Sequence, residues 1–248
     1  MMNNLILLLK HDLILVKNRI YVYVLFFLLP VLFILFFSIP LSFVFTDIKP
    51  IYLVWSTTGV SAISTLIFSS VLLLEVFLNR QDSQFIFSVP IKVTNYISSI
   101  YFFAFFMALF EFSFSIFLIN SLNNYFLTFT ECFIIFLLLI PAILILSSIT
   151  IILGCYTKEN ISFIIYIFSL FIVCSFGLGA FFPLNIYPDI YMGFIEFYPV
   201  SCTIFNIHRV IAADSIYFSL LVVSIIYSIF FIFISSVMVN SKIKERLY

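Results

Sequence analysis

The sequence predicts an all-α integral membrane protein, and hydropathy, charge and the length of the apolar runs lead to this prediction. The chain of 248 residues is 65% hydrophobic and 9% charged, and its mean hydropathy is +1.29. Soluble domains usually have about 25% charged residues. A single soluble core cannot hide this much apolar surface, so we expect lipid to be the solvent. We treat residues 1–248 as a single transmembrane domain.

The first element, residues 3–19, is expected to be an interfacial amphipathic helix. Charged residues interrupt its apolar run and no small-residue cleavage site follows, so a signal peptide is not predicted. Polar pairs recur every seven residues and form one narrow stripe on a helix, which favours the membrane interface over a span. The alternative is a frayed tail before the first span. The pairs are Asn3–Asn4, Lys10–His11 and Lys17–Asn18.

Six apolar runs follow, each close to the length of about 20 residues that a bilayer requires. Three prolines fall inside them, where neighbouring helices can cover the carbonyl groups that a proline leaves unbonded. The prolines are Pro30, Pro40 and Pro141, and the runs cover residues 20–45, 51–77, 96–119, 126–154, 161–178 and 215–238.

Basic residues predict the orientation. With the N-terminus inside, the outer side holds only Lys49 and Arg209, whereas the inner segments hold the other nine basic residues. This is a positive-inside bias. We therefore expect a multi-pass protein of the cell (plasma) membrane with both termini in the cytoplasm.

Two connections differ from ordinary short loops. Residues 78–95 form the largest cytoplasmic connection, which includes Arg80 and Pro90. Residues 179–214 are apolar, yet prolines break them too often for a span. We expect re-entrant helices there, because non-helical backbone at membrane depth is tolerated where protein buries it.

The sequence contains none of the catalytic motifs that we sought. None of the five glycines belongs to a phosphate-binding loop, and neither a HExxH motif nor a Gly-x-Ser-x-Gly motif is present. Two histidines and four scattered cysteines indicate neither a metal site nor a disulfide framework. Eleven basic and eleven acidic residues argue against nucleic acid as a partner. We predict no catalytic residue, no metal and no cofactor bound by this chain.

Polar residues inside two spans mark candidate substrate-path positions. On the second span they share one side of the helix, and on the fifth they follow a spacing of four and three. Helix–helix packing of small hydroxyl residues is the alternative to a substrate path, and the two are compatible. The residues are Thr57, Ser61, Ser64, Thr65 and Glu75 on the second span, and Ser162, Tyr166 and Ser169 on the fifth.

Glu111 is the deepest acidic residue, eight residues from the outer end of the third span. A carboxylate at that depth is costly unless it is protonated or partnered, so it is a functional candidate. Two hypotheses remain open: Glu111 pairs with Arg209 of the outer segment, or it is a neutral residue of the interior. We slightly favour the pair.

The order of these segments resembles the membrane subunit of ABC exporters of the ABC-2 family. The cytoplasmic connection has the family's basic residue, short helix and proline, and the outer segment has its order of glycine, prolines and His-Arg. Relatives often carry Gly-Thr-x-Glu at 82–85 and Asn before the proline at 199, and this chain differs at both. The matching residues are Arg80, Asp82-Ser83-Gln84 and Val89-Pro90-Ile91 in the connection, and Gly179, Phe182-Pro183, Pro188, Tyr198-Pro199 and His208-Arg209 in the outer segment.

The resemblance implies a permease that works as a homodimer or heterodimer with two copies of a separate ABC ATPase subunit, which would bind ATP and Mg. Residues 78–95 would couple to the ATPase through Arg80, Asp82, Ser83, Gln84 and Pro90, with a smaller contact at 155–160. Transport would run between two copies, lined by the second and fifth spans. The outer gate would comprise Gly179, Pro183, Pro188, Pro199 and Arg209.

The resulting expectation is export of a hydrophobic or amphipathic substrate: a drug, an antimicrobial peptide or a lipid-linked glycan. An ATPase-independent channel or secondary carrier is the alternative, although it would favour internal repeats or paired broken helices, which the sequence lacks.

Overall fold

In the computed structural model the regular secondary structure of the described residues is helical, with no strand among them, which confirms the predicted class in its coarse form. Four helices in it are long and apolar enough to cross a membrane. The structure describes residues 2–18, 20–46, 52–82, 93–122, 126–156, 165–166, 169–170, 172–173, 177, 179–182, 188–213 and 215–247.

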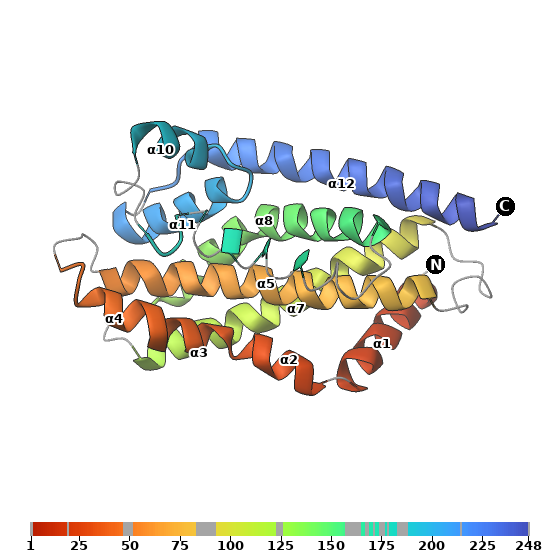
Figure 1. Cartoon of the computed structure of the whole chain (residues 1–248), viewed down its shortest axis with the longest axis horizontal. Coiled ribbons are helices and arrows are strands. Elements are labelled where there is room, and N and C mark those ends of the chain that lie inside the picture. Colours follow the sequence, from red (N-terminus) through yellow and green to blue (C-terminus); the bar gives the residue numbers. More distant parts are fainter. Residues whose placement is uncertain are drawn as a thin grey trace.

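The four long helices are α5 (Tyr52–Asp82), α7 (Val93–Leu122), α8 (Phe129–Tyr156) and α12 (Phe218–Leu247). They run along the long axis of the molecule (Figure 1). α5 packs against α7 and α8, and α12 lies on the other side of α8. Both chain termini lie at one end of this bundle, hereafter the terminal end, and the α7–α8 connection lies at the opposite end.

α5 is the central helix. Of its most apolar 18-residue window, 94% is buried, against 22% for that of α12. Two glycines allow close approach to α5: a Cβ on Gly59 would lie 2.2 Å from the Ala180 carbonyl oxygen, and one on Gly154 of α8 would lie 2.6 Å from the Phe77 ring. The α5 helix is therefore enclosed by protein, while α12 leaves most of its apolar surface outside.

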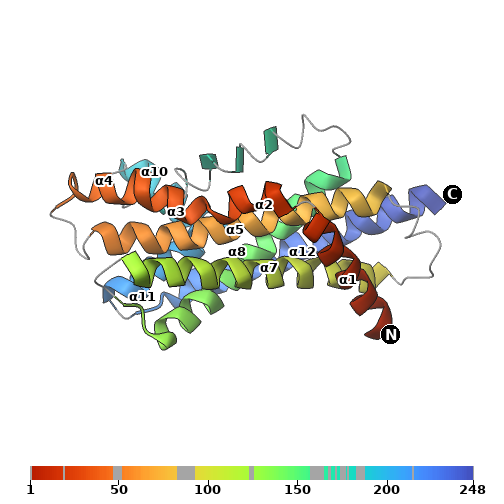
Figure 2. The ribbon, with the colours of Figure 1, turned by 90° about the horizontal axis from the view of Figure 1, so that it is seen from below.

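The first predicted span, 20–45, is a chain of short helices instead of one long helix. These are α2 (Ile20–Phe27), α3 (Leu29–Phe33), the π-helix η1 (Ile34–Ser38) and α4 (Ile39–Ser42). Proline lacks an N–H group and its ring clashes with the preceding turn, which accounts for the interruption at Leu28 before Pro30 and for the π-helix before Pro40. The segments run alongside α5 (Figure 2).

The helix α1 (Met2–Asn18) crosses the terminal end at an angle to the bundle (Figure 2). It packs against α5 and α7. Leu8 and Asp12 are buried on its inner side, whereas Ile6, Leu7, Leu13 and Ile14 are exposed beside Lys10 and Lys17. The predicted helix is confirmed as a helix, and its one buried charged residue points inward.

α8 begins with a capping box. The Thr128 N–H and hydroxyl both donate to Glu131 Oε2 at 2.7 Å, and the Glu131 N–H donates to the Thr128 hydroxyl at 3.3 Å. This reciprocal arrangement satisfies donors that a helix start leaves free. Glu131 therefore fixes the start of α8.

Two short helices occupy the predicted re-entrant region 179–214: α10 (Asp189–Glu196) and α11 (Ser201–Ala213). α10 packs on α11, and α11 packs on α5, α8 and α12. Both lie at the end of the bundle opposite the termini (Figure 1). The fifth predicted span, 161–178, falls mostly outside the described residues.

Candidate functional site

The polar side of α5 faces the interior of the chain. Thr57, Ser61, Ser64 and Thr65 are all 0% exposed. Each hydroxyl donates to a carbonyl three or four residues earlier in the same helix, at 2.7–3.2 Å. Such bonds satisfy a hydroxyl without a ligand.

In this structure the polar side of α5 faces helices of the same chain, and the path between two copies stays a prediction. Ser64 and Ser115 of α7 lie 3.2 Å apart through their hydroxyl oxygens. Small hydroxyl residues let helices approach and bond across their interface. These contacts support packing, which the sequence analysis left as the alternative, because the helical wheel placed the residues on one side without showing which side faces α7.

The terminal end holds a buried ion pair between α1 and α5. Arg80 is 1% exposed and Asp12 is 0% exposed. Arg80 Nε donates to Asp12 Oδ1 at 3.0 Å, and its Nη2 donates to Asp12 Oδ2. The two-point geometry matches a planar guanidinium to a carboxylate.

The start of α7 completes this arrangement. Arg80 Nη1 donates to the Ser99 hydroxyl at 2.8 Å, and its guanidinium carbon lies 5.2 Å from the centre of the Tyr96 ring. One guanidinium thereby joins α1, α5 and α7. We name Asp12, Arg80, Tyr96 and Ser99 the terminal cluster.

The predicted contact of Arg80 with an ATPase stays a prediction. In this structure the Arg80 side chain is enclosed by its own chain, where it holds three helices together. Of the other predicted coupling residues, Ser83, Gln84 and Pro90 lie outside the described residues, as does the Asp82 side chain, although Asp82 is the last residue of α5. The smaller contact predicted at 155–160 is described only for Cys155 and Tyr156.

Glu75 precedes Arg80 on α5 and also bonds to a neighbouring helix. The Tyr23 hydroxyl of α2 donates to Glu75 Oε2, and the Asn79 amide donates to the Glu75 carbonyl oxygen at 2.8 Å. Glu75 is 9% exposed. This predicted path residue therefore joins α5 to the first apolar run.

At the opposite end, residues 179–182 are fastened to α5. Gly179 has φ +72°, a conformation that side chains disfavour. The Tyr52 hydroxyl donates to the Phe181 carbonyl oxygen at 2.8 Å, and the Phe181 ring lies 4.9 Å from that of Phe33. A glycine turn and one tyrosine thus hold the segment against α5 and α3.

α11 is joined to α5 by a ring stack. The Trp55 and His208 rings are 3.7 Å apart and within 2° of parallel. His208 is 2% exposed, and neither of its ring nitrogens has a hydrogen-bond partner among the described residues. Burial lowers the pKa of His208 to about 3, because an interior site disfavours the charged ring.

The predicted pair of Glu111 and Arg209 does not form in this structure. Both carboxylate oxygens of Glu111 are buried without a hydrogen-bond partner among the described residues. The Arg209 guanidinium carbon lies 3.9 Å from the centre of the Tyr217 ring, an arrangement that stabilises a cation. The sequence pairing rested on Arg209 being the nearest plausible basic residue, and it overlooked Tyr217.

The remaining predicted residues are spread over the opposite end and the fifth predicted span. Pro188 precedes α10, and Pro199 lies between α10 and α11. The Tyr166 and Thr150 hydroxyl oxygens are 2.7 Å apart, and Ser169 is exposed. Ser162 and Pro183 lie outside the described residues.

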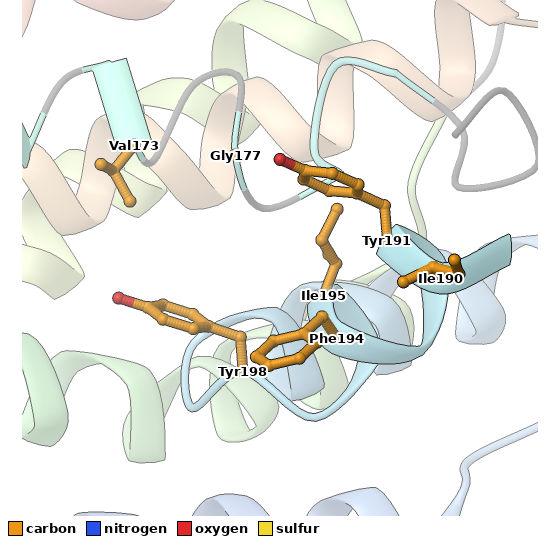
Figure 3. Close-up of a pocket in the computed structure, with 7 residues that line it drawn as sticks. All are labelled: Val173, Gly177, Ile190, Tyr191, Phe194, Ile195 and Tyr198. Atoms are coloured by element: carbon orange, nitrogen blue, oxygen red, sulfur yellow. The ribbon is translucent and has the colours of Figure 1, made fainter. Parts of the chain in front are cut away.

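A cavity of about 380 Å³ lies beside α10. The phenol rings of Tyr191 and Tyr198 project toward the segment that carries Val173 and Gly177 (Figure 3). The sequence analysis did not mark this cavity. Its one visible sign is the run of aromatic and aliphatic residues at 190–198. The lining residues are Val173, Gly177, Ile190, Tyr191, Phe194, Ile195 and Tyr198.

Together, these features define a helical membrane protein in which α5 connects two fixed ends. The terminal cluster holds one end, and Gly59, Tyr52 and Trp55 hold the 179–213 region at the other. Within the described residues, no three His, Cys, Asp or Glu side chains gather as a metal site would require. Neither a protein-family model nor a curated protein matches the sequence.

Proposed function

We propose that this chain is the membrane subunit of an ATP-driven exporter of the ABC-2 type. It would move a hydrophobic or amphipathic substrate out of the cell, as a drug, an antimicrobial peptide or a lipid-linked glycan. A second copy or a related permease would complete the dimer. ATP hydrolysis would take place, with Mg, on two separate ATPase subunits in the cytoplasm.

The terminal cluster is the observation that carries this proposal. Arg80 lies at the end of α5, just before the connection that resembles the family's coupling segment. Its bonds to Asp12 and Ser99 tie that point to α1 and α7. To transmit a movement of the ATPase to the membrane, the connection needs flanking helices that hold fixed positions relative to one another. If those helices moved independently, the movement would not reach the rest of the bundle. The cluster would supply this rigidity.

The opposite end supports the same proposal through its links to α5. Movement of α5 would reach residues 179–182 through Tyr52 and reach α11 through Trp55. The predicted gate residues Gly179, Pro188, Pro199 and Arg209 belong to this region. With α5 enclosed, the path between two copies would be lined by other surfaces, among which Ser169 is an exposed residue of the predicted set.

The test is purification of the affinity-tagged chain from its native membrane in mild detergent. The proposal expects a separate ABC ATPase to co-purify and the complex to hydrolyse ATP. The chain alone in proteoliposomes should show no flux of the candidate substrates. ATP-independent flux without a bound ATPase would instead support the channel or carrier alternative and would overturn the proposal.

A further inference from the structure

The cavity beside α10 has the size of a single hydrocarbon chain. A cavity of about 150 Å³ is sufficient for benzene, which has six carbons. At the same volume per carbon, the 380 Å³ beside α10 has room for about 15 carbons. The side chains that Figure 3 draws around it are aliphatic or aromatic apart from two phenol hydroxyls.

Two of the apolar lining residues are also widely exposed. Ile190 is 85% exposed, and Phe194 is 82% exposed. α10 packs on α11, which packs on the membrane-length helices α8 and α12. Apolar side chains this exposed, beside helices of this kind, are expected to be in contact with lipid.

The cavity also offers polar groups for one end of a ligand. Tyr191 is 64% exposed and Tyr198 is 46% exposed, and both rings point into the space in front of Val173 and Gly177 (Figure 3). A phenol can donate to an ester or phosphate oxygen. Tyrosine is favoured at the level of lipid headgroups for this reason.

We propose that this cavity binds one acyl chain of a membrane phospholipid. The chain lies against Ile195, Phe194 and Val173, and the polar end of the lipid accepts hydrogen bonds from Tyr191 and Tyr198. The site does not depend on the exporter proposal, because it requires neither an ATPase nor transport.

Gly177 provides a direct test, because it lines the cavity and a side chain can grow there. Among the described residues, a Cβ at Gly177 would have Val173 Cγ1 alone within 4 Å, at 3.8 Å. Gly177→Leu therefore extends from the cavity wall without a clash against the described backbone. Gly193 on α10 is a matched control, since its Cβ would meet no described atom within 4 Å and it is not one of the lining residues named above.

The experiment uses the full-length chain in phosphatidylcholine–phosphatidylglycerol nanodiscs that contain a phospholipid with a diazirine on its acyl chain. After photolysis, mass spectrometry locates the labelled peptides. The wild type and Gly193→Leu should be labelled on the peptide with Tyr191 and Phe194. Gly177→Leu should show about tenfold lower labelling there. This is the loss of affinity expected when the new side chain displaces about two methylene groups of the acyl chain from the cavity.

Two results would overturn the proposal. Equal labelling of Gly177→Leu and wild type would mean that lipid touches only the outer surface of α10. Loss of labelling in dimeric wild type, with labelling restored in monomers, would mean that a second copy of the chain covers the cavity. Thermal unfolding of all three proteins shows whether each variant is folded.

Discussion

Glu111 is the residue whose structural setting differs most from the expected one. A buried polar group without a partner, whether carboxylic acid or amide, lowers stability, because its hydration is lost and nothing replaces it. We therefore predict that Glu111→Gln leaves the melting temperature of the purified protein unchanged and that Glu111→Met raises it. Glu75→Gln is the comparison, and it should lower stability because Tyr23 donates to that carboxylate.

The absence of a Glu111–Arg209 pair can be tested by the additivity of stability changes. Sites without a shared partner have additive effects on stability within about 0.5 kcal/mol. The double variant Glu111→Gln, Arg209→Gln should therefore equal the sum of the two single variants. A Glu111→Gln variant that unfolds several degrees early and is rescued by Arg209→Gln would show that the pair forms in the membrane.

His208 gives the opposite end of the bundle a pH dependence. Its pKa is lowered to about 3 by burial, whereas an exposed histidine has a pKa near 6.5. Below pH 6.5 the opened state takes up a proton that the folded state refuses, so stability falls as the pH drops from about 6.5 toward 3. At pH 5.0 the loss from this group is about 2 kcal/mol.

We predict that His208→Phe flattens this dependence, since phenylalanine keeps a flat ring against Trp55 and cannot be charged. The measurement is the melting temperature between pH 7.5 and 5.0, compared with His11→Gln, which replaces the 40%-exposed histidine of α1. Parallel curves for His208→Phe and wild type would mean that the burial of His208 does not set the acid sensitivity.

At the scale of helices, the terminal cluster decides where α1 lies. Removing one partner leaves a buried charge without compensation, which typically costs about 3–5 kcal/mol. Asp12→Leu and Arg80→Leu should each destabilise the protein by this order. The double variant should lose much less, because two apolar side chains leave no buried charge.

Trypsin provides a second measurement of the cluster. Lys10 and Lys17 lie on the exposed side of α1, and release of α1 should speed cleavage at both in the single variants. Lys17→Gln is the control for the unfolding measurement, in which its stability should equal that of the wild type, and it leaves Lys10 as the cleavage site in α1. A double variant that loses the sum of the two single losses would mean that Asp12 and Arg80 contribute independently.

Some features of the helices could be predicted from the sequence, and others could not. The four long helices follow from hydropathy, and the irregularities before Pro30 and Pro40 follow from proline chemistry. The capping box Thr128-Phe-Thr-Glu131 was visible in the sequence but was not used. The partner of Arg80 was not predictable, because Asp12 is 68 residues away and nothing local indicates which acid a buried arginine meets.

The sequence also could not predict that the polar side of α5 faces the interior of the chain. A helical wheel gives the relative angles of Thr57, Ser61 and Ser64, yet burial depends on which helices surround α5. Both α5 and α12 are apolar enough to cross a membrane, yet 94% of the apolar window of α5 is buried against 22% of that of α12, so hydropathy does not predict burial. The cavity beside α10 was missed for a related reason, since its walls come from two segments that are separate in sequence.

At the scale of the whole molecule, the two ends of the bundle differ in charge. The terminal end holds Lys10, Lys17 and Lys242, and the opposite end holds Arg209 within α11. Positive residues favour the cytoplasmic side, so we predict that the terminal end is inside. The native cysteines report this poorly, because Cys155 is 4% exposed and Cys202 is 0% exposed.

Introduced cysteines on exposed positions test the orientation. In a background with the four native cysteines replaced by alanine, Asp189→Cys on α10 should react with a membrane-impermeant maleimide in intact cells. Lys17→Cys on α1 should react only after permeabilisation, because the bilayer separates it from the reagent. A variant that retains Cys202 alone should stay unlabelled until the protein is unfolded in detergent, which controls for burial. Labelling of Lys17→Cys from outside, together with protection of Asp189→Cys, would invert the orientation and place the terminal cluster on the side where no ATPase can reach it.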